Sequence, residues 1–201
     1  RVCPFELGLD LSQWSDVLIC DYNYVFDPKA YLKRYFLDTG GNYGFLVDEA
    51  HNLVDRARDM YSAQIRRGEV RAVIKALGND LPAARHALGA LDHYLSTQIQ
   101  RCADEGGGDG WLDRTPPTDL QPLLHRVQNE IEPVLARNRV TSWKEPLTDL
   151  FFTILAFLRV YDLFDEHYVT YGEKHGQWDL TLRLYCLDPS SRIREACKRG
   201  R

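Results

Sequence analysis

The sequence lacks the features that define membrane and secreted proteins. No apolar run approaches the roughly 20 residues that a membrane-spanning helix needs, and no signal peptide is recognisable at the start of the chain. Its five cysteines are irregularly spaced and form no CxxC pair, which argues against a disulfide framework or a self-contained zinc site. We therefore expect a cytoplasmic, reducing environment and no membrane partner.

Two further absences limit the chemistry that the chain performs alone. There is no GxxxxGK[ST] motif, so we expect no tight binding of ATP, because such a loop supplies the amides that hold the phosphates. There is also no excess of basic residues, with 25 Lys and Arg against 29 Asp and Glu; nucleic acid would need a local basic patch. Because the sequence opens without a Met, we expect a piece of a longer protein, monomeric on its own.

What is present is an ordinary globular composition, 201 residues of which 44% are hydrophobic. The apolar runs DVLIC (16–20) and YGFLV (43–47) are typical of buried strands. Between them, residues 27–41 have a Pro in the expected first turn of a helix and a Gly pair at its end. This order predicts a strand, helix, strand unit with parallel pairing, as in α/β proteins.

Helical periodicity replaces this pattern from about residue 68 to 164. Apolar residues share one face in three segments, spanning residues 81–99, 120–134 and 147–161. Ser142 and Glu145 have capping-box spacing before the third. Residues 167–174 and 178–188 then alternate across a turn and predict a hairpin, and 190–199 predicts a last helix. The predicted fold class is mainly α with a smaller α/β part, in which a helical segment is inserted into an α/β domain.

The most informative motif is Asp48-Glu49-Ala50-His51, directly after the second predicted strand. A carboxylate at the end of a buried strand, such as Asp48, holds Mg²⁺ in nucleotide hydrolases, and a neighbouring one, here Glu49, orients or deprotonates water. His51 is placed to report the state of the phosphates. The alternative is that the two acids only cap the next helix.

Together, VCPFELGLDLSQWSDVLICDYNYVFDP and FLVDEAHNLVDRARDMYSA resemble the XPD/DinG family of iron-sulphur superfamily-2 DNA helicases, and LRLYCLDPSSRIRE resembles that family's return to its first motor domain. The resemblance implies three segments: residues 1–60 from RecA-like motor domain 1, with the end of the iron-sulphur region and the DEAH box; 61–168 as the helical arch domain; and 169–201 as the hairpin and helix returning to motor domain 1.

The same resemblance implies roles for single residues. Asp48 would bind the Mg²⁺ of ATP, Glu49 would be the catalytic base, and His51 would belong to the same motif. Cys3 would be the fourth ligand of a 4Fe-4S cluster. Because such a cluster needs four thiolates, and the phosphate loop and other cluster cysteines are missing, we expect neither a cluster nor ATPase activity in this chain alone.

Two groups of residues are candidates for binding single-stranded DNA. Asn23 and Tyr24 lie in DYNYVF, where aromatic rings can stack with unpaired bases, although alternating aromatics near a sheet are more often core residues. Arg66, Arg67 and Arg71 lie in a basic cluster that can neutralise phosphates, although solvated helix faces carry the same residues.

The predicted function is that of a fragment of an ATP-dependent DNA helicase, acting in DNA repair or replication and inactive by itself. The alternative is a non-catalytic protein-interaction module with a vestigial acidic motif, which exposed apolar residues on the outer face of helix 143–164 would favour. A metal-dependent nuclease needs further clustered acids near Asp48, and none is evident.

Overall fold

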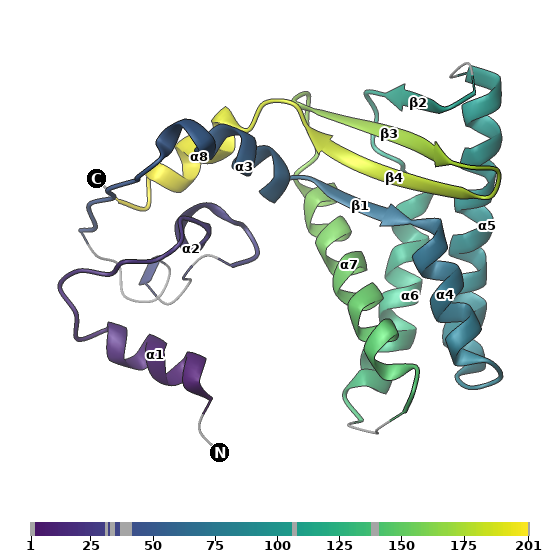
Figure 1. The fold of residues 1–201 in the computed structure, drawn as a ribbon, viewed down its shortest axis with the longest axis horizontal. Helices are drawn as coiled ribbons and strands as arrows, with labels where there is room; N and C mark the ends of the chain where they lie inside the picture. The colour runs from purple at the N-terminus through teal and green to yellow at the C-terminus, as the bar shows by residue number, and fades with distance from the viewer. Residues whose placement is uncertain are drawn as a thin grey trace.

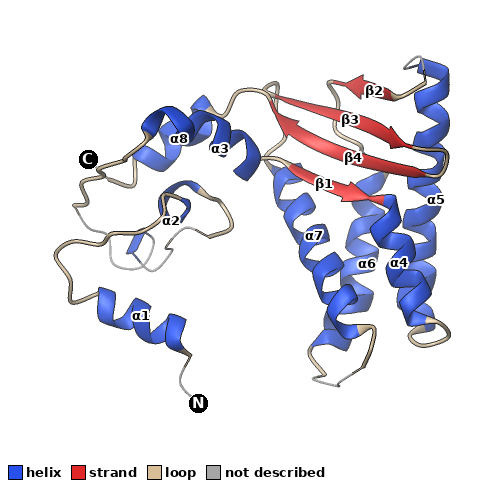
Figure 2. Ribbon diagram, in the orientation of Figure 1, coloured by secondary structure: helices blue, strands red, loops and turns tan. Residues whose placement is uncertain are grey.

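The computed structural model describes residues 3–30, 32, 35–36, 42–105, 108–137 and 141–200. Its centre is a four-stranded sheet in the order β1-β4-β3-β2. The strands are β1 (Ala63–Arg66), β2 (Gly110–Asp113), β3 (Tyr168–His175) and β4 (Asp179–Cys186). All three strand pairs are antiparallel, so strands from both ends of the helical segment join in one sheet (Figures 1 and 2).

The hairpin predicted from the alternating pattern is confirmed, and its two strands are β3 and β4. On β4, the buried leucines Leu180, Leu182 and Leu184 point to the helices, and Ile65 of β1 lies opposite Leu182 on the same face. Gly176 in the connecting turn has φ +70°, a left-handed conformation that Gly adopts without strain. One face of the sheet is thus part of the core, as is usual for antiparallel sheets.

Four helices, called the helical unit below, form a bundle on the buried side of the sheet (Figure 1). They are α4 (Arg67–Leu77), α5 (Pro82–Glu105), α6 (Leu120–Leu135) and α7 (Lys144–Asp162). The helices α4, α5 and α7 pack on the strands, whereas α6 packs mainly on α5 and α7. The apolar faces predicted for the last three are confirmed, since Leu88, Leu91, Leu124, Leu147 and Ile154 are all fully buried. No helix in the described ranges combines the length and the apolarity needed to cross a membrane.

A smaller group of helices, from the first and last described parts of the chain, lies beside this unit (Figure 1). It comprises α1 (Pro4–Ser12), α2 (Asn23–Phe26), α3 (Leu53–Met60) and the predicted last helix, α8 (Ser190–Cys197). The Tyr61 hydroxyl donates to the Phe26 carbonyl at 2.9 Å, and Arg199 Nη1 donates to the Val25 carbonyl at 2.5 Å. These bonds hold α2 against the residues that follow α3 and α8.

The structure corrects the predicted strand, helix, strand unit. Residues 16–20 and 43–47 lie outside the sheet, and Ile19 and Leu46 are almost fully exposed. A strand needs hydrogen bonds from a neighbouring strand, and neither run has one among the described residues. Of the helix predicted over 27–41, residues 28–30 form turns, and 31, 33–34 and 37–41 lie outside the described residues.

Two smaller details also differ. The capping box predicted at Ser142 and Glu145 does not form, because Trp143 is the N-cap residue of α7 and makes no side-chain capping bond. The short strands β1 and β2 were not predicted, since four residues are too few for alternation to be recognised. The mainly α class is confirmed, whereas the arch and RecA-like assignments stay predictions.

Candidate functional site

The acidic motif forms an exposed turn ahead of α3. Asp48 Oδ1 accepts a hydrogen bond from the Glu49 N–H at 2.8 Å, and Ala50–Asn52 form one 3₁₀ turn before the helix. Glu49 has φ +49°, which is uncommon for a residue with a side chain and concentrates at functional sites. Asn52 is the N-cap residue of α3. Glu49 is the N-cap residue of the 3₁₀ turn that leads into α3, but its side chain makes no capping bond, so the alternative raised from the sequence is met in position and not in hydrogen bonding.

The side chains of this turn are open to solvent and lie close together. Glu49 Oε2 is 3.3 Å from His51 Nε2, and the two side chains are 65% and 74% exposed. This distance places the carboxylate and the imidazole within ion-pair range of each other. Asp48 is also exposed. It offers carboxylate oxygen, the donor that Mg²⁺ prefers, and Mg²⁺ needs only one or two protein carboxylates when phosphates and water complete its coordination. Asp48 thus offers one carboxylate of the kind that Mg²⁺ uses in nucleotide sites.

Cys3 does not have the neighbours that a cluster requires. It is an exposed free thiol just before α1. Among the described residues, the single group of three or more potential metal ligands that comes together does not include it. Because a 4Fe-4S cluster is held by four thiolates, the residues present do not fit this group. The role of Cys3 as a cluster ligand stays a prediction for a longer protein.

Asn23 and Tyr24 begin the short helix α2, and both are half-buried. The Asn23 N–H donates to Asp21 Oδ1 at 2.8 Å, and the Tyr24 carbonyl accepts from the Leu32 N–H at 2.9 Å. Their backbones are therefore fixed within the smaller helical group. Their half-buried side chains keep part of their surface available for a ligand.

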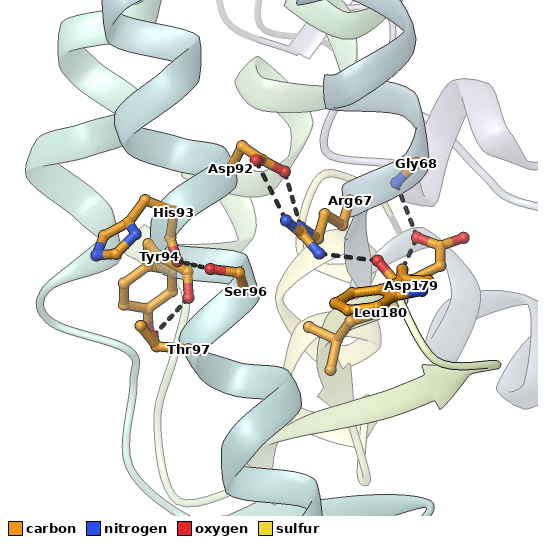
Figure 3. Close-up of polar contacts among 10 residues, drawn as sticks. Arg67, Gly68, Asp92, His93, Tyr94, Ser96, Thr97, Asp179 and Leu180 are labelled. Carbon is orange, nitrogen blue, oxygen red and sulfur yellow. Dashed lines mark hydrogen bonds and ion pairs between the residues drawn. The ribbon is translucent and has the colours of Figure 1, made fainter.

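Arg67 is held inside the helical unit by three hydrogen bonds. Its Nε and Nη2 donate to Asp92 Oδ1 and Oδ2 of α5 at 2.7 and 3.3 Å, and its Nη1 donates to the Trp178 carbonyl at 2.8 Å. The side chain is only 11% exposed. Figure 3 shows Arg67 between the helix that carries Asp92 and the hairpin turn before Asp179. Such a fork ties α4, α5 and the hairpin together.

Arg66 is paired as well, but it is more accessible. Its Nε donates to Asp179 Oδ2 at 2.7 Å, and its side chain is 51% exposed. Asp179 Oδ1 also accepts from the Gly68 N–H at 2.8 Å (Figure 3). Burial raises the pKa of Asp179, but the bonds from Arg66, Gly68 and Leu180 outweigh it and leave the pKa below its ordinary value. The carboxylate therefore stays charged and keeps its guanidinium partner.

Arg71 differs from these two, because it lines an open cavity. The cavity has a volume of about 350 Å³ and lies between α4 and the start of α5. Lys75 from the next turn of α4 and Arg85 from α5 also line it. The described residues give Arg71 and Lys75 no carboxylate partner, whereas Asp92, which also lines the cavity, is bound by Arg67. Three cations at one concave site attract phosphate. Arg85 was not predicted from the sequence, because it lies 14 residues after Arg71 and outside the basic cluster that contains it.

A group of potential metal ligands lies at the other end of the sheet. Donor atoms of Asp165, Glu166 and His167 lie within 4.8 Å of one another. However, Asp165 Oδ2 accepts from Arg192 Nη2 at 2.8 Å, and Asp165 Oδ1 accepts from the His167 N–H at 3.0 Å. A guanidinium at this distance repels a cation. The ion pair between Asp165 and Arg192 links the residues before β3 to α8.

The face that would favour a protein-interaction module is small. On α7, Phe152 is 62% exposed, while its neighbour Phe151 is half-buried against the core. A single exposed apolar side chain is ordinary on a protein surface, and interaction sites need a larger contiguous patch. The outer face of α7 therefore does not favour this alternative.

Comparisons with known proteins place the acidic motif in a family context. Residues 1–70 match the DEAD_2 family model. The chain is similar to the "Regulator of telomere elongation helicase 1 homolog" of Drosophila persimilis, with 25% identity over 174 residues, 86% of this chain and 15% of that protein. It is 33% identical over 88 residues to the protein of the same description in Aedes aegypti, 44% of this chain and 8% of that one.

These matches confirm the resemblance to XPD/DinG-type superfamily-2 helicases. The chain spans about 15% of the length of the Drosophila relatives. The family match includes the acidic turn. The alignments with the Drosophila relatives, which cover 86% of this chain, include the turn and extend into the helical unit.

Proposed function

We propose that this chain is part of an ATP-dependent DNA helicase that couples ATP hydrolysis to movement along single-stranded DNA and to duplex unwinding, in DNA repair or replication. The observation that carries the proposal is the DEAH sequence at 48–51 inside the DEAD_2 match of residues 1–70. In this proposal residues 1–60 belong to motor domain 1, 61–168 to the helical arch, and 169–201 to the return segment.

The exposed turn would supply the hydrolytic groups. Asp48 would hold Mg²⁺, which when bound neutralises charge on the nucleotide phosphates. Glu49 would accept a proton from the attacking water. The 3.3 Å contact between Glu49 and His51 supports a role for His51 in orienting that carboxylate. The phosphate-binding loop that completes such a site would come from elsewhere in the longer protein, as would the further ligands of a cluster at Cys3.

Single-stranded DNA would follow the basic surface of the helical unit. Arg71 is the strongest of the proposed contacts, because it lines a cavity with Lys75 and Arg85 and has no carboxylate partner among the described residues. Arg66 and Arg67 would have to leave Asp179 and Asp92 to reach a phosphate. Asn23 and Tyr24 remain proposed contacts of the smaller helical group.

The test uses the longer protein that contains this chain. Glu49→Gln should abolish DNA-stimulated ATP hydrolysis while ATP binding persists, because the amide cannot accept the proton. Asp55→Asn, at an exposed acid in the first turn of α3, is the matched control and should hydrolyse ATP normally. A Glu49→Gln protein with full activity would remove the proposed role, and a longer protein without a phosphate loop would remove the helicase proposal.

A further inference from the structure

A second cavity lies where the smaller helical group meets the sheet. Its volume is about 290 Å³, close to the lower end of small-molecule sites, which span about 300 to 1,000 Å³. The lining comes from five parts of the chain: Lys29 after α2, Asp59 and Ser62 around the end of α3, Gln64 on β1, Thr153 on α7, and Arg183 and Tyr185 on β4. β1, β4 and the upper part of α7 lie side by side there (Figure 1).

Arg183 is the central cation of this cavity, and its charge is not balanced by an acid. Its Nε donates to Gln64 Oε1 at 2.9 Å, and its Nη2 donates to the same oxygen. The guanidinium also lies over the Tyr171 ring, 5.7 Å from its centroid. Both partners are neutral, and the described residues offer it no carboxylate within ion-pair distance. A fixed, uncompensated guanidinium is suited to bind phosphate.

This arrangement distinguishes Arg183 from the arginines that form ion pairs in the helical unit and its sheet, and Arg183 shares the lack of a carboxylate partner with Arg71. Arg66, Arg67 and Arg101 each bind a carboxylate at 3.0 Å or less. The ammonium group of Lys29 on the opposite wall is likewise without an ion pair in the described structure, and Lys29 is exposed. Two cations therefore face the cavity, with Asp59 as its one carboxylate.

Tyr185 adds an aromatic surface to the same cavity. It follows Arg183 by two residues on β4, so both side chains lie on the face of the sheet opposite the helices. The ring is half-buried and packs edge-on against Tyr171, with centroids 6.3 Å apart and planes at 70°. Edge-on packing fixes the orientation of the Tyr185 ring. A ring held in this way beside a guanidinium that has no acidic partner can stack with a base while the cation binds the adjoining phosphate.

We propose that this cavity binds one nucleotide of single-stranded DNA, with the base stacked on Tyr185 and its phosphate held by Arg183 and Lys29. The Gln64 carboxamide, whose oxygen is used by Arg183, presents its NH₂ group as a donor to the base or sugar. The inference rests on the proposed function and deepens it, because it adds a base contact outside the basic cavity around Arg71. None of these four residues was predicted from the sequence.

The test is fluorescence anisotropy of the 201-residue chain with two labelled oligonucleotides of equal length, one of thymidines and one abasic. Tyr185→Ala should weaken binding of the thymidine strand about tenfold and leave the abasic strand unchanged, because stacking needs a base. Tyr185→Phe, which keeps the ring, should bind both strands as the unaltered chain does. Lys29→Gln and Arg183→Gln should each lower the slope of log affinity against log salt by about 0.7 on both strands.

Phe152→Ala and Arg114→Gln are the matched controls, an exposed aromatic and an exposed cation outside the cavity lining, and should leave affinity and slope unchanged. Circular dichroism and thermal unfolding establish that each variant folds. If Tyr185→Ala does not fold, Lys29→Gln, which changes an exposed residue in a turn, still tests the site. The inference would be overturned if Tyr185→Ala bound the thymidine strand as tightly as the unaltered chain does, or if Lys29→Gln had the salt slope of the unaltered chain. If affinity for the strands fell only in a variant that combines Arg71→Gln with Lys75→Gln, the DNA-binding proposal would stand and this cavity would be rejected. If the unaltered chain bound neither strand, both proposals would be rejected.

Discussion

At the scale of single residues, the basic side chains divide by what they already bind. Arg67 and Arg71 lie one turn apart on α4 and were equal candidates in the sequence. In the structure Arg67 is 11% exposed and forked onto Asp92, whereas Arg71 is exposed and lines a cavity. The difference depends on Asp92, which is 25 residues further along the chain, so sequence spacing alone does not reveal it.

Replacing Arg67 tests this division directly. Arg67→Ala should destabilise the chain by about 2 kcal/mol, because it removes the charged partner of the Asp92 carboxylate, which is 24% exposed, and the bond to the Trp178 carbonyl. Arg71→Ala should change stability by less than about 0.5 kcal/mol, as expected for an exposed position. Urea denaturation followed by far-ultraviolet circular dichroism measures both. Equal stability of Arg67→Ala and the unaltered chain would contradict the structural role.

Asp179 should make stability depend on pH in the acidic range. Its pKa in the folded chain lies below the ordinary value of 3.8, because the bonds from Arg66, Gly68 and Leu180 outweigh the effect of burial. A depressed pKa contributes stability above the unfolded pKa and loses it as the pH falls through the folded one. Asp179→Asn should therefore be less stable than the unaltered chain at pH 7, and the difference should shrink below about pH 4.

Thermal unfolding between pH 2.5 and 7 measures this effect. Asp162→Asn, at an exposed acid at the end of α7, is the control. Its stability should differ little from that of the unaltered chain, and this difference should not shrink below pH 4 as it does for Asp179→Asn. A stability difference at Asp179 that stays constant from pH 7 to 2.5 would show that the ion pair does not carry the effect.

At the scale of elements, the sequence predicts what local periodicity encodes. Three long helices, the hairpin and the last helix are recognisable because their apolar residues repeat at 3.6 or 2 positions over many residues. β1 and β2 have four residues each, and they are strands only because β4 and β3 lie beside them. Conversely, the runs at 16–20 and 43–47 have strand composition without a strand partner in the described structure.

The contact between β2 and β3 depends on a glycine. A Cβ atom built on Gly172 would lie 2.5 Å from Trp111 Nε1 and 2.8 Å from its Cε2. Trp111 cannot move freely, because its Nε1 donates to the Gln98 carbonyl at 3.2 Å and the Arg101 guanidinium lies 3.9 Å from its ring centroid. Gly172→Ala should destabilise the chain by about 2 kcal/mol through this clash.

Gly89→Ala is the matched control for that substitution. Gly89 is exposed within α5, and its added Cβ would meet nothing within 4 Å. The change should stabilise the chain by about 0.5–1 kcal/mol, because Ala is the better helix former. Opposite signs of the two stability changes in thermal unfolding would confirm the close contact at Gly172 and the open space at Gly89, and a Gly172→Ala chain as stable as the unaltered one would contradict the tight packing of Trp111.

At the scale of the whole molecule, burial is unevenly distributed along the chain. The helical unit and its sheet contain most of the buried side chains, and α3 and α8 extend the same core. α1 buries no residue, and Trp14, Val17 and Ile19 after it are 77% exposed or more. The candidate site follows this division. The proposed roles of Asp48 and Glu49 can be predicted from the DEAH sequence alone, whereas both proposed DNA-binding cavities depend on cations brought together from different segments.

Removing residues 1–20 should therefore leave the midpoint of thermal unfolding within about 2 °C of the original value, because almost no buried apolar area is lost. The hydrogen bond between Ser12 and Tyr35, which is only partly buried, is among the links that disappear. A second deletion, through residue 30, is the control. It removes Phe26, which is 1% exposed, together with the acceptor of the Tyr61 hydroxyl, and should lower the midpoint by several degrees. Equal losses in the two deletions would mean that residues 1–20 stabilise the core through contacts that their exposure does not reveal, whereas the expected contrast places the edge of the cooperative unit between Ile19 and Phe26.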